Sequence, residues 1–262
     1  MSDYKKAKQK YDFYIRLALL SVLIPFLYCL LARENVTLII LSFIVYVVLS
    51  FIVLVIFSIW HSNILKELLD SRNHLESWRQ FIQINSAARF RLTKLQAKFA
   101  AILYNYMMGD FVLVIKETEE LEDRNNLTQQ QKNKLEKHFI SAVILSKSDL
   151  TKSELQDMIS RVSIANADVK KEIKERSEAI YDIVIAHQVN DYFERISDDS
   201  KFSQLEILYF KALNSLLKAN DTKAKELFNT IIKEDNELYI VRESKKYFEM
   251  KDMSIDKRQQ FF

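Results

Sequence analysis

The chain has 262 residues, a formal net charge of +3, and a single glycine, a single proline and a single cysteine. Average usage would give roughly 18 glycines and 13 prolines, so turns that require special φ angles are almost excluded and an all-α fold is predicted. The lone Cys29 excludes an intramolecular disulfide. Beyond residue 60 basic and acidic residues balance, which gives no reason to expect a nucleic-acid partner.

The first element, residues 1–16, is a basic N-terminal segment. It contains four lysines, at positions 5, 6, 8 and 10, and aromatic residues directly before the apolar run that follows. Lysines beside anionic headgroups and aromatic rings at the interface are typical of a cytoplasmic membrane end. The sequence therefore predicts a cytoplasmic N terminus.

The next element is a predicted transmembrane hairpin over residues 17–60. Residues 17–32 carry no charge, and residues 36–60 are predominantly apolar and longer than the roughly 20 residues that span a bilayer. Only residues 33–35 separate the two runs, so both are expected to cross as antiparallel helices. A cleaved signal peptide is the alternative for the first run. The predicted location is the cell membrane, with two passes and both termini cytoplasmic.

Apolar residues continue at helical spacing beyond Trp60. Residues 61–94 are predicted to form an amphipathic stalk helix, so that residues 36–85 would make one rod. The heptad pattern is not sustained, and coiled-coil dimerisation is the minority alternative. Polar clusters then punctuate residues 95–250 at intervals typical of a series of αα-hairpins. Residues 251–262 are predicted to be a C-terminal tail.

The hairpin at residues 205–232 carries the clearest repeat signal. Its first helix has an apolar stripe that includes Ala212, and its second helix has Ala224 followed four residues later by Phe228. This A-x-x-x-F step resembles the signature of tetratricopeptide repeats. A second hairpin near residues 95–121 resembles the same repeat, because the only glycine, Gly109, falls where that family often has a turn. The signature Trp and the second-helix Pro are missing, and a generic helical bundle is the alternative.

The resemblance implies a groove lined by the first helix of each hairpin. Transferring those positions gives a low-polarity set expected to bind an amphipathic helix of a partner. The alternative is that these residues are core. The set is Gln96, Phe99, Leu103, Tyr106, Glu206, Tyr209, Leu213 and Leu216.

Searches for catalytic motifs find no phosphate-binding loop, nucleophile elbow or metal-ligand spacing, and no cofactor, metal or enzymatic activity is predicted. The leading hypothesis is a membrane-anchored cytoplasmic adaptor that binds a protein or peptide segment within a membrane complex. The alternative is an accessory or immunity-type subunit whose transmembrane hairpin packs against a transporter, channel or receptor. The lipid bilayer is a predicted partner in both.

Overall fold

The computed structural model describes residues 3–31, 36–69, 74–121, 124–162, 164, 166–198 and 200–251. Within these ranges the chain forms eleven α-helices, two short 3₁₀ turns and no β-strand, which confirms the predicted all-α class. The chain divides into two compact units, Met1–Phe81 and Ile82–Phe262. Most of the predicted tail, residues 252–262, lies outside the described residues.

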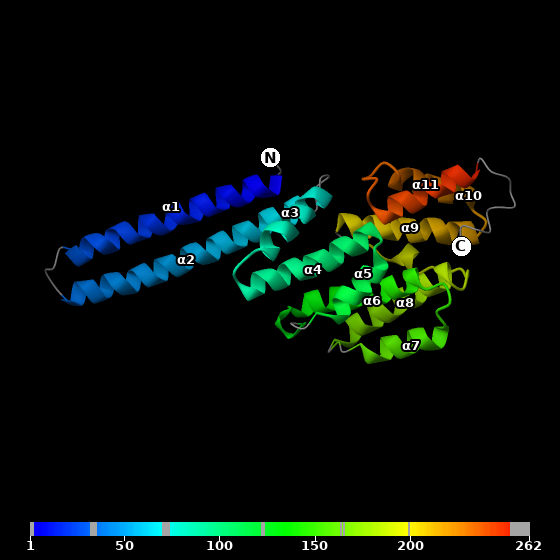
Figure 1. The fold of residues 1–262 in the computed structure, drawn as a ribbon, viewed down its shortest axis with the longest axis horizontal. Coiled ribbons are helices and arrows are strands. Elements are labelled where there is room, and N and C mark those ends of the chain that lie inside the picture. Colours follow the sequence, from blue (N-terminus) through cyan, green and yellow to red (C-terminus); the bar gives the residue numbers. More distant parts are fainter. Residues whose placement is uncertain are drawn as a thin grey trace. The chain divides into compact units, whose positions relative to one another are not determined.

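The first unit contains two long helices, α1 (Asp3–Leu31) and α2 (Val36–Leu69), which run antiparallel (Figure 1). Aromatic contacts fix this direction. Tyr11, early in α1, meets Phe57, late in α2, with ring centroids 6.0 Å apart. Phe26 stacks on Tyr46 with centroids 4.9 Å apart. The predicted turn between the helices lies outside the described residues.

Both helices are long and apolar enough to cross a membrane, over Lys5–Tyr28 and Ile39–Phe57. No residue of either apolar window is buried within the described chain. The hydroxyls of Ser21 and Ser42 donate to carbonyl oxygens of their own helices, at 2.7 and 2.8 Å. Such internal bonds satisfy polar groups where no water is present. Beyond the basic first turns of α1, the described exterior of α1, and of α2 as far as Phe57, is therefore predominantly apolar and suited to hydrocarbon.

The predicted rod over residues 36–85 falls on two described helices. Helix α2 ends at Leu69 and a separate helix, α3, covers His74–Ser86. Residues 70–73 between them lie outside the described residues. The predicted limits of the stalk and of the soluble domain stay predictions.

The second unit consists of helices joined mostly by short connections, apart from residues 185–200, which carry a 3₁₀ turn between α8 and α9 (Figure 1). Most successive helices pack as neighbours, α6 packs on α8, and α11 also packs against α4 and against α9. The contacts of the first helix with the last close the unit. The helices are α4 (Arg91–Met108), α5 (Phe111–Glu119), α6 (Gln129–Ser146), α7 (Lys152–Arg161), α8 (Ala167–Val184), α9 (Lys201–Leu217), α10 (Asp221–Ile231) and α11 (Tyr239–Lys251), with 3₁₀ turns η1 (Arg124–Asn126) and η2 (Phe193–Arg195).

Side-chain caps replace glycine and proline as the signals that begin helices. Thr128 and Thr151 each form a capping box, with Gln131 and Glu154 respectively. Each box satisfies backbone N–H groups that a helix N-terminus leaves without a partner. The predicted turn at Gly109 is confirmed, since this residue ends α4 in the left-handed region with φ of 80°.

Candidate functional site

A buried cluster of three polar side chains joins α4, α8 and α9 of the second unit. An Nη of Arg176 in α8 donates to Oε2 of Glu206 in α9, at 2.5 Å. The hydroxyl of Tyr106 in α4 donates to Oε1 of the same carboxylate, also at 2.5 Å. The Arg176 and Glu206 side chains are only 3% and 1% exposed. Both oxygens of Glu206 are therefore hydrogen-bonded in a water-excluded setting, as buried charges require.

Local helix periodicity places these groups inside. Arg176 lies on the face of α8 that also buries Ile173 and Ile180, because residues three and four apart share one side of a helix. Its guanidinium also lies over the Phe193 ring, 5.5 Å from the centroid, a distance suited to a cation–π contact. The arginine is thus held by one carboxylate and one aromatic face.

The electrostatics of the cluster keep Arg176 and Tyr106 each in one protonation state. Burial alone would lower the pKa of Arg176, but the Glu206 charge and neighbouring tyrosines raise it above its ordinary value. Burial, and then the charge of Glu206, raise the pKa of Tyr106 well above its usual range. Around neutral pH the arginine is therefore charged and the phenol is neutral. Neither of these two groups is tuned to exchange a proton at that pH.

His138 of α6 lies against the cluster. Its ring centroid is 4.3 Å from that of Tyr106, and its Nδ1 atom is buried without a hydrogen-bond partner among the described residues. Burial, reinforced by the positive charges of Lys137 and Arg176, holds the pKa of His138 well below its ordinary value. This imidazole is therefore neutral at physiological pH.

A polar cavity of about 390 Å³ adjoins Arg176. The Nζ of Lys137 lies 3.6 Å from Oε1 of Glu172 at this cavity, and burial, then the charge of Arg176, lower the pKa of Lys137. The volume falls within the range of small-ligand sites. The lining residues are Lys137, Glu172, Arg176, Tyr192, Ile196, Ser197, Asp198, Ser203 and Ile207.

The cavity offers hydrogen-bond donors and acceptors together. The Nε of Arg176 is buried and has no partner within the described residues. Burial alone would raise the pKa of Asp198, but the Ser200 N–H and the Lys137 charge lower it below its ordinary value. A ligand group that accepts hydrogen bonds could therefore bind to Arg176, and a ligand group that donates them could bind to Asp198. No group of three metal-ligating side chains occurs in the part of the chain that the structure describes.

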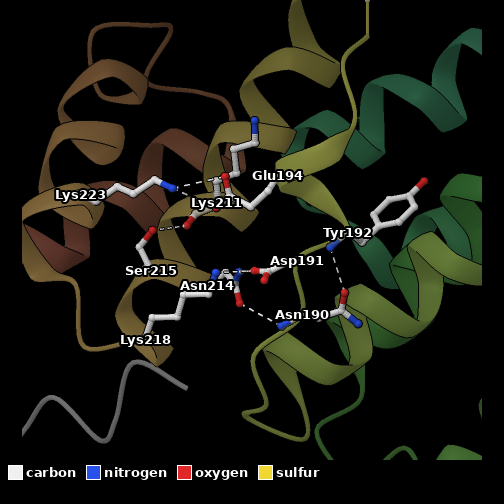
Figure 2. Close-up of polar contacts among 9 residues, drawn as sticks. All are labelled: Asn190, Asp191, Tyr192, Glu194, Lys211, Asn214, Ser215, Lys218 and Lys223. Carbon is white, nitrogen blue, oxygen red and sulfur yellow. Dashed lines mark hydrogen bonds and ion pairs between the residues drawn. The ribbon is translucent and has the colours of Figure 1, made fainter.

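One wall of the cavity is fixed by a separate polar network around Asn214 (Figure 2). The Asn214 Oδ1 accepts from the Asn190 backbone N–H, and its Nδ2 donates to Asp191 Oδ1, both at 3.0 Å. The Lys223 Nζ donates to Glu194 Oε1 at 3.1 Å. These bonds attach the segment that carries η2 to α9 and α10. They thereby position Tyr192 at the cavity.

The structure places the eight predicted groove residues largely in the core. Six are buried, while Gln96 and Leu216 are partly exposed. Gln96 accepts a hydrogen bond from Gln131 at 2.5 Å. Tyr106 and Glu206, from the two predicted hairpins, meet directly. Partner binding by these eight residues stays a prediction. The buried ones are Phe99, Leu103, Tyr106, Glu206, Tyr209 and Leu213.

Three residues of the site, Lys137, His138 and Arg176, carry no motif and were not predicted. The only available signal is an arginine at a position of α8 whose neighbours at helical spacing are apolar. Comparisons with protein-family models, with curated protein sequences and with solved structures found no match to this chain.

Proposed function

We propose that this protein is a membrane-anchored adaptor whose helical second unit binds a protein or peptide segment. The observation that carries the proposal is the apolar exterior of α1 and α2. Side chains such as Leu31 and Phe51 are 81% and 67% exposed. Apolar faces of this extent need a cover, and a bilayer supplies one for helices of this length.

Both termini are proposed to be cytoplasmic, which the lysines ahead of α1's apolar residues and the basic residues after α2 support. The test uses single cysteines in a Cys29→Ser background. A cysteine at position 35 should react with an impermeant maleimide on intact cells. One at the exposed Lys225 should react only after lysis. Labelling of position 225 in intact cells would refute this orientation.

A repeat-like arrangement is proposed for the α9–α10 hairpin. Ala212, Ala224 and Phe228 are fully buried where the two helices pack. Small residues at such contacts let paired helices approach closely, as in the tetratricopeptide resemblance. The α4–α5 pair, joined at Gly109, is its proposed counterpart.

The proposed contact point for the partner is the polar cavity. Its support is the buried, unpartnered Arg176 Nε next to a volume of about 390 Å³. An acceptor from a partner side chain or a terminal carboxylate would satisfy that donor. Ser197 is exposed at this cavity and offers a position for a photo-crosslinking amino acid.

A photo-crosslinker at Ser197 should give a discrete adduct in membranes. The adduct should weaken when Lys137→Gln alters the cavity and persist in the matched control Lys225→Gln. A crosslinker at Lys225 should give no such adduct. Equal adducts from both positions, or an adduct indifferent to Lys137→Gln, would remove the cavity from the proposal.

The second candidate is an accessory or immunity-type subunit that acts through its membrane hairpin. It is favoured by an apolar groove of about 510 Å³ between α1 and α2, lined by residues that include Leu17 and Phe57. A crosslinker at the exposed Ile44 discriminates the two functions. An adduct at Ile44 with none at Ser197 would favour the subunit, and the reverse would favour the adaptor.

A further inference from the structure

The chain carries an unbroken basic stretch where it enters the second unit. No acidic residue occurs between Glu76 and Asp110, while arginines or lysines occupy positions 79, 89, 91, 94 and 98. Residues 61–262 hold 32 basic and 32 acidic residues in all, so outside these five positions the same span has 27 basic against 32 acidic. This stretch is therefore a local positive region rather than part of a generally basic protein.

Exposed apolar side chains lie among these charges at the start of α4. Phe90 is 74% exposed and Leu92 is 61% exposed. The four basic side chains from position 89 onward are exposed as well, and those at 91, 94 and 98 recur at the spacing of one helix face. We call this set the entry surface: Arg89, Phe90, Arg91, Leu92, Lys94 and Lys98.

The elements packed beside α4 carry charges of both signs. Gln131 at the start of α6 reaches Gln96, and the residues that follow it on α6 include Lys132 and Lys134. On α5, Glu117 bonds to Asn105, which is about 21 Å along α4 from Arg91 at 1.5 Å per residue. At the end of α5, Glu120 lies 4.0 Å from Lys116, so both of these carboxylates have contacts of their own.

We propose that the entry surface docks on an anionic lipid surface. Phe90 and Leu92 would enter the headgroup boundary, and the four cations would contact lipid phosphates. This inference rests on the proposed membrane anchor. Only 32 residues, counted as 89 − 57, separate Arg89 from the end of the second span at Phe57, so the surface is held within about 110 Å of the bilayer. Such a tether gives a high effective concentration.

Lipid suits the mixture of groups better than nucleic acid does. Phosphates of either partner would satisfy the cations, and an aromatic ring could stack on a base. An exposed leucine beside that phenylalanine gains nothing from a nucleotide, whereas both side chains are removed from water at a membrane interface.

The test uses the full chain reconstituted in nanodiscs. An environment-sensitive fluorophore is attached to a single cysteine at position 92, in a Cys29→Ser background. Discs contain phosphatidylcholine alone or with phosphatidylglycerol at about 7:3. We expect blue-shifted emission and quenching by brominated lipids only in the anionic discs. The same label at Val112, which is 75% exposed on α5, is the matched position control and should not respond.

Charge variants decide the mechanism. Removing two cations with Arg89→Gln and Lys94→Gln should lower the docked-to-free ratio about 25-fold, at about fivefold per cation. The control pair Lys225→Gln and Lys233→Gln removes the same charge from exposed positions elsewhere and should leave docking unchanged. Equal losses in both pairs would overturn the proposal, because they would show a response to net charge alone.

Two further readings separate failure of this inference from failure of the anchor. A label at Ile44 should be quenched by brominated lipid in both disc types. If this label is not quenched, the membrane anchor itself is refuted. Quenching at position 44 with no response at 92 would refute only the docking surface. A response at 92 to added single-stranded RNA, without one to anionic lipid, would assign the surface to nucleic acid and overturn the lipid proposal.

Discussion

Breaking the Arg176–Glu206 pair should destabilise the second unit more than removing both charges. Glu206→Gln keeps an acceptor for the Tyr106 hydroxyl but leaves the guanidinium buried without a counter-charge. Arg176→Met leaves the carboxylate with one hydrogen bond of the two it has now. Removing one partner of a buried ion pair costs about 3–5 kcal/mol.

The double variant Arg176→Met with Glu206→Gln removes both charges and retains the acceptor for Tyr106. Its expected cost is about 1–2 kcal/mol, since a buried pair adds little net stability over a neutral replacement. The double variant should therefore be several kcal/mol more stable than the summed losses of the two single variants would give. In a unit of this size 1 kcal/mol corresponds to about 2–4 °C in melting temperature, so each single should melt about 6–20 °C below the wild type.

The assay is thermal and urea unfolding of the full chain in detergent. Near-ultraviolet circular dichroism of tyrosines suits it, because both tryptophans, at positions 60 and 78, precede the second unit. The control is the exposed Lys171–Glu175 pair, whose side chains are 73% and 49% exposed. Lys171→Met with Glu175→Gln should cost under about 0.5 kcal/mol. A cluster double variant that costs the sum of its singles would refute the reasoning.

Four other substitutions test separate parts of the structure. The pKa of His138 is lower in the folded than in the unfolded chain, so below pH about 6.5 the unfolded chain binds one proton more. The free energy of unfolding should therefore fall by up to about 1.4 kcal/mol for each unit by which the pH is lowered. His138→Gln should flatten that slope in urea titrations. Gly109→Ala should lower the free energy of unfolding by about 2 kcal/mol or more in melting experiments, because φ is 80° and a Cβ would lie 2.7 Å from Tyr239 Cβ. Ala219→Gly, at φ 56°, should leave that free energy unchanged or raise it by up to about 1 kcal/mol. Leu92→Glu should abolish lipid docking yet raise stability by about 0.3–1 kcal/mol, since an acid joins the first turn of α4; a destabilised variant would contradict the dipole argument.

Local signals predicted the helical class, the apolar hairpin and the Gly109 turn. Scarcity of glycine and proline, long uncharged runs and a single left-handed residue all act within a few positions of the chain. The buried cluster is different in kind. Tyr106 and Glu206 are 100 residues apart, and Arg176 is 30 residues from Glu206. Nothing near any of the three indicates that its neighbour will be a buried charge.

The predicted groove shows a related limit. First-helix positions in a repeat were assigned by periodicity, which identifies one face of a helix but not what covers that face. In this chain α11 packs on both α4 and α9, so most of those positions are buried. The cavity instead lies among α6, α8, α9 and the η2 segment. Its location depends on packing between non-consecutive elements, which periodicity does not encode.

Helix α4 connects the two proposed surfaces of the second unit. The entry surface covers its first turns and the two residues before it. Tyr106, near the other end of the helix, hydrogen-bonds the carboxylate that also binds Arg176 at the cavity. The 18-residue helix is about 27 Å long and rigid on that scale. Docking of one end on lipid would therefore restrict the directions in which the cavity can face. A partner embedded in the same membrane would then meet a partly oriented site, which lowers the rotational entropy lost on binding.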